Sequence, residues 1–311
     1  MATKSVHETV LMQEAVDALL QDKSGFYVDA TFGRGGHSRL ILQRLAANGR
    51  LVVLDKDPEA ITVAKELQQH DSRLEVVHAA FSQLQQLVDS FDIGEGCDGI
   101  LFDLGVSSPQ LDEAERGFSF LRNGPLDMRM NPTQGISAAQ WINSAAEKDI
   151  ADVLYKYGEE RHSRRMAKRI IIERKLKPIT TTGELAEIVK EANPSWERDK
   201  HPATRAFQGI RIFINSEMDE LEKGLDQTLE LLKVGGRMVA ISFHSLEDRM
   251  VKKFIAKQTK GDRYPRDLPV PQSLLNPRLK PIGKAVKASA KEIEKNPRAR
   301  SAVMRVAEKI A

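Results

Sequence analysis

A glycine-rich loop carries the first residues whose types and spacing suit chemistry. The loop follows an apolar run and reads Asp29-Ala30-Thr31-Phe32-Gly33-Arg34-Gly35-Gly36-His37. Glycines let the backbone approach a ligand closely, and the helix expected to follow offers unpaired N–H groups at its start. A dinucleotide-binding loop has the spacing G-x-G-x-x-G, whereas this loop has G-x-G-G and lacks the third glycine. The loop therefore predicts a ligand site of another kind.

The acid that precedes these glycines indicates which ligand. Asp29 stands four residues before Gly33, which matches the acidic-x-G-x-G-x-G loop of S-adenosylmethionine enzymes with Thr31 in place of the first glycine. A carboxylate at a strand end suits the cationic methionine end of that cofactor better than it suits a phosphate. A tight strand–helix turn without any ligand is the alternative.

Two residues farther along fit a bound nucleoside. Asp55 ends the second apolar run, about 20 residues after Gly36, which is the offset at which an acid meets ribose hydroxyls. Because NAD and S-adenosylmethionine both contain that ribose, Asp55 does not distinguish them. Phe81 follows the third apolar run and suits an adenine face, although a core phenylalanine fits the spacing equally well.

A polar segment after the fourth apolar run suits the second substrate. It reads Asp103-Leu104-Gly105-Val106-Ser107-Ser108-Pro109-Gln110. Open α/β sheets bind ligands in loops after the carboxyl ends of their strands. The segment is loosely similar to the acidic or polar residue, Pro-Pro and aromatic of methyltransferases that act on exocyclic amines. Such an amine is a weak nucleophile, and acceptors such as Ser107 and Ser108 would hold its N–H groups and aim its lone pair.

The remaining candidates each have a structural alternative. His244, after a later strand, would orient substrate or accept a proton, or is a hydrogen-bonded structural histidine. Trp141 would stack on a flipped base, although a helix-core tryptophan is favoured by its neighbours. A basic helical stripe suits RNA phosphates or is a solvated face; it comprises Arg161, Arg164, Arg165, Lys168 and Arg169.

Metal binding and covalent catalysis are not expected. His7, His37 and His201 are scattered and have no cysteine partner. The one cysteine, Cys97, excludes a disulfide scaffold and a multi-cysteine zinc site. It precedes the fourth strand, where it is poorly placed to attack a base.

Short apolar runs that alternate with helical patterns predict the elements that hold these residues. The runs are continuous, as in strands buried on both faces of a parallel sheet, and comprise 25–30, 51–55, 74–78 and 99–103. Helices are expected over 38–46 and 58–69. A fifth strand is expected at 238–243, after a turn at 234–237 and a long helical region from 203 to about 233.

The middle of the chain has a different character. From about Asp112 to Gln208 we find no convincing strand, and capping-box spacing recurs at Ser137, Ser144 and Thr181. We therefore expect one α/β domain made of residues 1–111 and 209–311, with an all-helical insertion at 112–208 that recognises RNA. The segment 257–311 is expected to be a basic tail with little periodicity before Ala299.

The length suits two domains, and the single cysteine with no membrane span or signal peptide predicts a protein of the cytosol. The chain has 311 residues and a net charge of +3. That charge is unevenly distributed, because residues 257–311 hold 14 Lys and Arg against 5 Asp and Glu. No apolar stretch is long enough to span a membrane, and Met1–Glu8 lack the layout of a signal peptide.

Longer strings give a specific family resemblance. Besides the two loops above, the strings begin at Glu115, Gly124, His201 and Ser242; they read ERGFSF, GPLDMRM, HPATR and SFHSLEDR. Together they resemble the bacterial RsmH (MraW) family, from His7 to about Arg305. The resemblance implies a Rossmann-like class I S-adenosylmethionine methyltransferase domain. It also implies methyl transfer to N4 of one cytidine in the decoding region of 16S rRNA, in the small ribosomal subunit.

The resemblance further implies which residues contact the cofactor. They are Gly35, Gly36, His37, Asp55, Phe81, Asp103 and Gln110. Two other classes stay open from the residues alone: a non-catalytic rRNA-binding assembly factor, and an NAD-dependent dehydrogenase, which the loop spacing disfavours. The sequence also leaves open the oligomeric state, a homodimer included.

Overall fold

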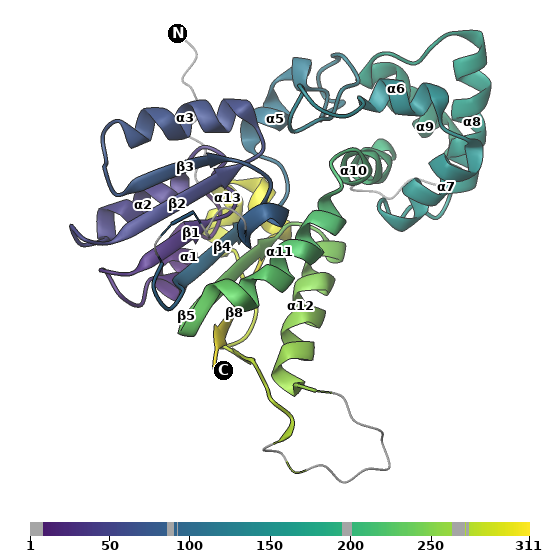
Figure 1. The fold of residues 1–311 in the computed structure, drawn as a ribbon. Helices are drawn as coiled ribbons and strands as arrows, with labels where there is room; N and C mark the ends of the chain where they lie inside the picture. Colours follow the sequence, from purple (N-terminus) through teal and green to yellow (C-terminus); the bar gives the residue numbers. More distant parts are fainter. Residues whose placement is uncertain (1–8, 86–89, 92, 195–200, 263–270, 272–273) are drawn as a thin grey trace. The chain divides into compact units, whose positions relative to one another are not determined.

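The computed structural model describes the chain except for residues 1–8, 86–89, 92, 195–200, 263–270 and 272–273. The signal-peptide argument on Met1–Glu8 and the histidine His7 therefore lie outside the described residues. The chain forms two compact units: residues 1–105 with 218–311, and residues 106–217. The larger unit contains the sheet (Figure 1).

The first unit is built on a central sheet whose parallel strands match the continuous apolar runs. Its first five strands are β1 (Phe26–Asp29), β2 (Arg50–Asp55), β3 (Leu74–His78), β4 (Cys97–Asp103) and β5 (Leu232–Ser242). All four residues of β1 are buried, and so are the four central residues of β2. The sheet is thus covered on both faces, as the sequence predicts.

Three further strands come from the carboxyl-terminal segment: β6 (Leu279–Pro281), β7 (Val286–Lys287) and β8 (Val303–Lys309). The strand order is β3-β2-β1-β4-β5-β8-β6, and β8 runs antiparallel to both β5 and β6. An antiparallel strand inserted beside β5 distinguishes this sheet from the all-parallel order of a dinucleotide-binding fold. The predicted fold class, an α/β domain with a Rossmann-like sheet, is confirmed.

This topology corrects the expectation of a basic tail. Residues 257–311 hold three strands, α13 (Ala290–Lys295) and a 3-10 turn η4 (Pro297–Ser301). Met304 and Ala307 of β8 are buried in the core. The prediction was wrong because Arg305, Glu308 and Lys309 stand among the apolar residues of β8, so net charge hid a strand.

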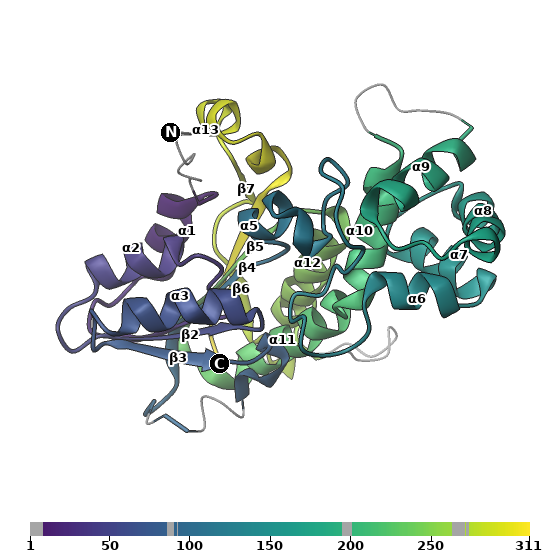
Figure 2. The same cartoon turned by 90° about the horizontal axis from the view of Figure 1, so that it is seen from above.

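Helices cover both faces of the sheet (Figure 2). One face packs against α1 (Met12–Leu19), α2 (Gly36–Arg44) and α3 (Pro58–Gln68), which share a core with alternate strand residues such as Leu101. Its neighbour Phe102 points the other way, toward Gly224 of α11 (Glu217–Leu231). Helix α12 (Ser245–Lys260) also contacts the outer strands β5, β6 and β8.

Two expected boundaries in this unit differ from the structure. The expected turn at 234–237 lies inside β5, where Gly235 has a φ of 84° and the pairing with β4 shifts register between Cys97 and Gly99. The long helical region is two helices, because Ser216, with a φ of 52°, ends α10 (Ala203–Ile214) before α11 begins. A bulge and a single left-handed residue leave little trace in hydrophobic periodicity.

The second unit is helical. It contains α5 (Ser108–Asp112), the 3-10 turn η2 (Ala114–Arg116), α6 (Ala138–Ser144), α7 (Glu147–Lys156), α8 (Ser163–Leu176), α9 (Thr182–Ala192) and α10. Among its described residues the extended pairing is one isolated bridge, between Pro125 and Thr181. Helices α6 to α10 share a core that includes Ile142, Leu154, Ile170 and Ile210.

Local signals explain most of these helix starts. Ser137 and Thr181 cap α6 and α9 through the predicted capping boxes. Ser144 instead ends α6, and α7 begins after Ala146 without a side-chain cap, so that predicted start was wrong. Because α10 belongs to the core of this unit, the division falls after Glu217, whereas the sequence placed it after Gln208.

Candidate cofactor site in the first unit

The candidate site lies where the carboxyl ends of β2, β1 and β4 are adjacent in the sheet. The chain order of the strands reverses between β1 and β4, which is the switch point at which open α/β sheets bind ligands. Asp29, Asp55 and Asp103 are the last residues of these three strands. These three aspartates, which the sequence analysis singled out, therefore lie at the same edge of the sheet.

Asp29 is a buried carboxylate that organises the glycine loop. It is 1% exposed and accepts hydrogen bonds from the Ser38 hydroxyl (2.5 Å) and the Thr31 backbone N–H (3.1 Å). Burial raises its pKa to about 6, and the nearby Asp55 adds to the increase while these hydrogen bonds oppose it. The charge of Asp29 is thus destabilised and suits a cationic partner.

Thr31 links the loop to the end of β4. Its hydroxyl oxygen accepts a hydrogen bond from the backbone N–H of Asp103 at 2.6 Å. A glycine at this position, as in the wider S-adenosylmethionine motif, would not make that bond. The departure from the motif thus has a structural reason, because Thr31 fixes β1 and β4 together beside the switch point.

Asp103 is the most perturbed acid of the edge. Burial raises its pKa well above the usual range, and the carboxylates of Asp29 and Glu247 raise it further. Its Oδ2 lies 3.5 Å from Nδ1 of His37. Its Oδ1 is buried and makes no hydrogen bond with the described residues. A buried acceptor of this kind is costly unless a ligand satisfies it.

His37 lies in the first turn of α2 and is 3% exposed. Burial lowers its pKa to about 4, while a backbone hydrogen bond to Val10 opposes the decrease. The imidazole is therefore neutral at neutral pH and does not compensate the charge of Asp103. The predicted cofactor contact of His37 stays a prediction.

Asp55 connects the loop to the second strand. Its carboxylate accepts hydrogen bonds from the backbone N–H groups of Gly33 (2.8 Å) and Asp57 (2.9 Å). Burial raises its pKa, which these hydrogen bonds oppose. The contact of Asp55 with ribose hydroxyls stays a prediction. In the structure Asp55 holds the glycine loop through its hydrogen bond from Gly33.

The three glycines of the loop are needed for different structural reasons. Gly35 has a φ of 76°, precedes α2 and has its α-carbon close to the ring of Phe32, so that an added Cβ would lie 2.6 Å from Cζ. A Cβ on Gly36 would lie 1.7 Å from the hydroxyl of Thr9. Gly33 has a φ of 57° and open space around it, so it alone offers free approach to a ligand.

Phe81 lies just after β3 and is half-buried. Its ring packs edge-on against Phe102, with ring centroids 5.8 Å apart, and an added Cβ on Gly224 would lie 2.9 Å from it. The core alternative accounts for these contacts. The proposed contact with adenine remains a prediction, since part of the ring stays exposed.

The residues at this edge fit S-adenosylmethionine. Burial raises the pKa values of Asp29 and Asp103, and the nearby carboxylates of Asp29 and Glu247 raise that of Asp103 further. A cationic ligand would relieve that repulsion, and the buried Oδ1 of Asp103 offers it an unused acceptor. A pyrophosphate, by contrast, would bring two more negative charges to the same place.

Three predicted site residues belong to the second unit. Ser107 caps α5, and its backbone N–H donates to Oε1 of Gln110 at 2.9 Å. Gln110 is 5% exposed, so its side chain has a structural use in addition to the predicted cofactor contact. Ser108 is the first residue of α5. They follow Asp103 in the chain by four to seven residues, and their roles toward ligands remain predictions.

His244 has the structural role that was its alternative. It is the N-cap of α12, and its Nδ1 accepts a hydrogen bond from the backbone N–H of Glu247 at 3.4 Å. The Glu247 carboxylate accepts in return from the N–H groups of Phe243 (2.7 Å) and His244 (3.2 Å). This reciprocal capping holds Glu247 beside the acids of the sheet edge.

Cys97 and Trp141 are both buried. Cys97 begins β4, at the opposite edge of the sheet, and burial raises its pKa to about 12. Trp141 is 6% exposed and packs against Phe213, with ring centroids 4.7 Å apart. Burial of Trp141 favours the core alternative over stacking on a base.

The basic stripe of the second unit is exposed. Arg164, Arg165 and Lys168 project from α8, and Arg161 immediately precedes it. Arg169 differs, because it forms ion pairs with Glu173 (2.9 Å) and Glu191 (3.0 Å). The stripe thus keeps four exposed cations, which fits either RNA phosphates or a solvated face.

The structure also brings in residues that the sequence did not single out. Ser38 bonds to Asp29, Thr9 packs against Gly36, and Glu247 acts on Asp103. Only Glu247 had a sequence signal, since it stands three residues after His244 in a capping-box spacing. The other two contacts depend on tertiary structure.

The sheet order and the acidic switch point define a class I methyltransferase domain. Over residues 4–310 the chain matches the model of the MraW methylase family, and it belongs to that family. The resemblance predicted from the sequence is confirmed. S-adenosylmethionine is accordingly its cofactor, as predicted.

Two relatives are similar over almost their whole length. Both are named ribosomal RNA small subunit methyltransferase H. The one from Marinomonas sp. (strain MWYL1) is 53% identical over 99% of each chain, and the one from Pseudoalteromonas atlantica is 54% identical over 100% of each chain.

The chain was also compared with solved structures. An rRNA methylase from Streptococcus thermophilus aligns over 100% of this chain and 99% of its own, with 10% identity and a TM-score of 0.42. Within the described part of the chain, no helix is both long and apolar enough to cross a membrane.

Proposed function

We propose that this protein transfers a methyl group from S-adenosylmethionine to N4 of cytidine 1402 in 16S rRNA of the small ribosomal subunit. The relatives' names support the small-subunit rRNA as substrate. The observation that carries the proposal is the buried Oδ1 of Asp103, an unused acceptor among acids at the switch point of the sheet. The site of action would be the cytosol.

The cofactor, when bound, supplies an electrophilic methyl group on a sulfonium sulfur. Asp29 and Asp103 would hold its cationic end. Burial raises the pKa values of both carboxyl groups, an effect that a neighbouring cation would oppose. Asp55 would accept from the ribose, and Phe81 would face the adenine. Gly33 provides the open backbone beside them.

The chain's contribution to the transfer is positioning. The amine of cytosine is a poor nucleophile because its lone pair is conjugated with the ring. Ser107 and Ser108, four and five residues after Asp103, would accept from its N–H groups and direct the lone pair at the methyl carbon. Cys97 takes no part, because its thiol is buried at the other edge of the sheet with a pKa near 12.

The second unit would hold the RNA. Its exposed stripe on α8 presents Arg164, Arg165 and Lys168 for phosphate contacts, which are independent of base sequence. Base recognition would then fall to the loop near Ser107. A homodimer stays a proposal that sedimentation of the purified protein tests.

One experiment tests the reaction and its target. The protein is incubated with radiolabelled S-adenosylmethionine and small subunits from cells that lack the gene, and the nucleosides are then separated. We expect label in N4-methylcytidine at the one position. Label in another nucleoside contradicts the target, and no label with intact cofactor binding supports a non-catalytic assembly factor. Naked 16S rRNA in a parallel reaction identifies which form is the substrate.

A further inference from the structure

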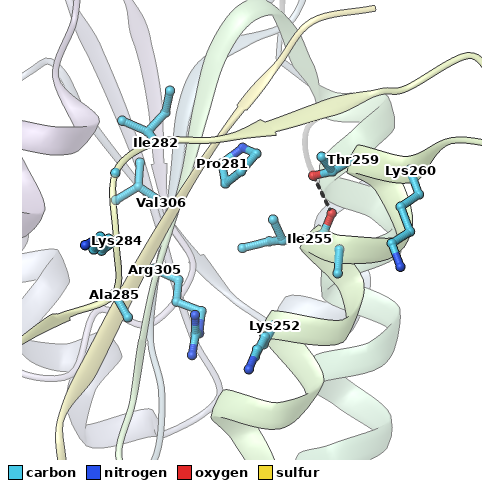
Figure 3. Close-up of a pocket in the computed structure, with 12 residues that line it drawn as sticks. Lys252, Ile255, Thr259, Lys260, Pro281, Ile282, Lys284, Ala285, Arg305 and Val306 are labelled. Carbon is cyan, nitrogen blue, oxygen red and sulfur yellow. Dashed lines mark hydrogen bonds between the residues drawn. The ribbon is translucent and has the colours of Figure 1, made fainter. Parts of the chain in front are cut away.

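A pocket of about 310 Å³ lies between α12 and the turn that joins β6 to β7, away from the sheet edge that holds the acids (Figure 3). Its walls come from α12, from the turn and from β8. The lining residues are Lys252, Ile255, Ala256, Thr259, Lys260, Pro281, Ile282, Gly283, Lys284, Ala285, Arg305 and Val306. None of them takes part in the site described above.

The pocket is preformed by hydrogen bonds between its walls. The backbone N–H of Ile282 donates to the carbonyl of Val306 at 2.9 Å, which fixes the turn on β8. Arg305 donates two hydrogen bonds to Asp248 of α12, at 2.7 Å and 3.0 Å, which fixes β8 on the helix. A ligand would therefore bind without ordering the walls first.

The floor is aliphatic and the rim is cationic. Ile255 and Val306 are buried at the floor, whereas Lys252, Lys260 and Lys284 are exposed around it. Asp248 neutralises Arg305, but the described residues give none of these three lysines an ion-pair partner. The rim therefore has a net positive charge that attracts an anion.

The surroundings extend that charge. From Arg249 to Lys260 the chain has five basic residues and no acidic one, and from Arg278 to Lys287 it has four and none. Both segments adjoin the pocket. A field of one sign over two elements favours a polyanion over a single small anion.

We propose that this pocket binds the sugar–phosphate backbone of the substrate RNA. The lysines would contact phosphates, and the aliphatic floor would take the ribose face. The Thr259 hydroxyl donates to the carbonyl of Ile255 at 2.8 Å, so the lining offers no oriented side-chain donor to read a base edge. The contact is thus one that positions RNA without reading its sequence. The inference rests on the proposed function, since its ligand is that enzyme's substrate.

The test compares two double variants of the full chain that change net charge equally. Lys252→Glu with Lys284→Glu alters the pocket, and Lys23→Glu with Lys65→Glu alters exposed lysines on other elements of the same unit. Affinity for a labelled RNA fragment of the decoding region is measured at several salt concentrations. Thermal unfolding and S-adenosylmethionine binding show that each variant is folded.

We expect the pocket variant to lose roughly tenfold or more in RNA affinity at low salt. The slope of log affinity against log salt should decrease by about 0.7 to 0.9 for each lost phosphate contact. The matched variant should stay close to wild type. Lys252→Gln with Lys284→Gln should give a smaller loss in the same direction, which serves if the glutamate variant fails to fold.

Three outcomes would overturn the inference. Equal losses in both glutamate variants would mean that only overall charge matters, and no loss in either would mean that the pocket does not bind RNA. Loss of binding to phosphatidylglycerol vesicles with unchanged RNA binding would assign the pocket to a lipid surface. Any of these outcomes leaves the proposed function standing if the wild-type protein methylates small subunits. If wild type does not methylate them, the proposed function fails separately.

Discussion

Nδ1 of His37 lies 3.5 Å from Oδ2 of Asp103, and burial moves the pKa values of the two groups in opposite directions. The pKa of His37 falls to about 4, whereas that of Asp103 rises well above its usual range. Burial therefore disfavours the charged form of each group. A cationic ligand beside Asp103 would oppose this effect of burial on its carboxyl group.

This relationship predicts how Asp103 variants behave. Asp103→Asn keeps the size of a neutral carboxyl group, so the fold should survive with little change in the free energy of unfolding. The variant cannot become an anion, and loss of a charge-assisted hydrogen bond of about 1.5–3 kcal/mol should weaken S-adenosylmethionine binding by about 10- to 100-fold. Asp103→Ala should abolish binding. Isothermal titration calorimetry measures both, and tight binding by either variant would remove Asp103 from the site.

Asp29 predicts a pH dependence of stability. Its pKa of about 6 in the folded protein exceeds the value of 3.8 for an exposed aspartate, so the folded state binds the proton more tightly than the unfolded state does. The stabilisation from this group is complete below about pH 4 and is lost as the pH rises through 6. Relative to Asp29→Asn, wild type should therefore lose about 3 kcal/mol between pH 4 and 7. Urea unfolding of both proteins across this range measures the difference.

The cofactor should counteract that dependence. A cation beside Asp29 lowers the pKa of the carboxyl group, so binding should weaken as the pH falls from 7 to 5. The same titration with Asp29→Asn, which has no ionisable group there, is the control. An affinity for S-adenosylmethionine that is equally independent of pH in both proteins would show that Asp29 does not face the cation.

The sequence predicted the parallel strands and the acids at their ends because both depend on local residue order. Continuous apolar runs marked β1 to β4, and aspartates at the ends of the first, second and fourth runs marked the edge. It missed the contact of Ser38 with Asp29 and that of Thr9 with Gly36, because each depends on how helices pack on the sheet. Contacts made by tertiary packing have no characteristic spacing in the sequence, so the sequence does not predict them.

Two other failures have a different cause. Strand β8 was hidden because Arg305 and Glu308 stand among its apolar residues, and a count of charges does not show that they are paired with Asp248 and Arg237. The end of α10 was hidden because Ser216 adopts a left-handed conformation at a residue type that seldom does so. Net charge and hydrophobic periodicity are averages over a segment. Neither average shows how two charges of β8 are paired or that Ser216 is left-handed.

His244 separates a capping role from a catalytic one. His244→Asn retains an N-cap acceptor, so stability and methyl transfer should both stay close to wild type. His244→Ala removes the acceptor and should cost about 1 kcal/mol of stability. Thermal unfolding and single-turnover methylation measure the two effects. A stable His244→Asn protein that no longer transfers methyl groups would restore the histidine as a substrate-facing group.

Strand β8 predicts what truncation does. A chain that ends at Ala302 lacks β8. Strand β5 then loses its antiparallel neighbour, and the core loses the buried side chains of Met304 and Ala307. We expect it to lose cooperative unfolding and S-adenosylmethionine binding, which circular dichroism and calorimetry detect. Removal of Ala311 alone is the control. A truncated chain that still folds and binds the cofactor would mean that β8 is an appendage to the sheet.

The basic stripe on α8 predicts an effect on RNA binding and none on cofactor binding. Arg164 and Lys168 lie one turn apart on an exposed face, so Arg164→Gln with Lys168→Gln removes two adjacent cations. RNA affinity should fall, and its salt slope should decrease by about 0.7 to 0.9 per lost contact, while cofactor affinity stays unchanged. Lys148→Gln with Lys175→Gln removes the same charge from exposed positions of the unit outside the stripe.

Arg169 supplies an internal comparison for the same measurement. Its guanidinium is paired with Glu173 and Glu191, so Arg169→Gln should change RNA affinity less than Arg164→Gln does. Surface ion pairs contribute about 1 kcal/mol or less, so stability should also change little. If all these variants bind RNA alike, the stripe is a solvated helix face, and the RNA contacts of this unit lie on another surface.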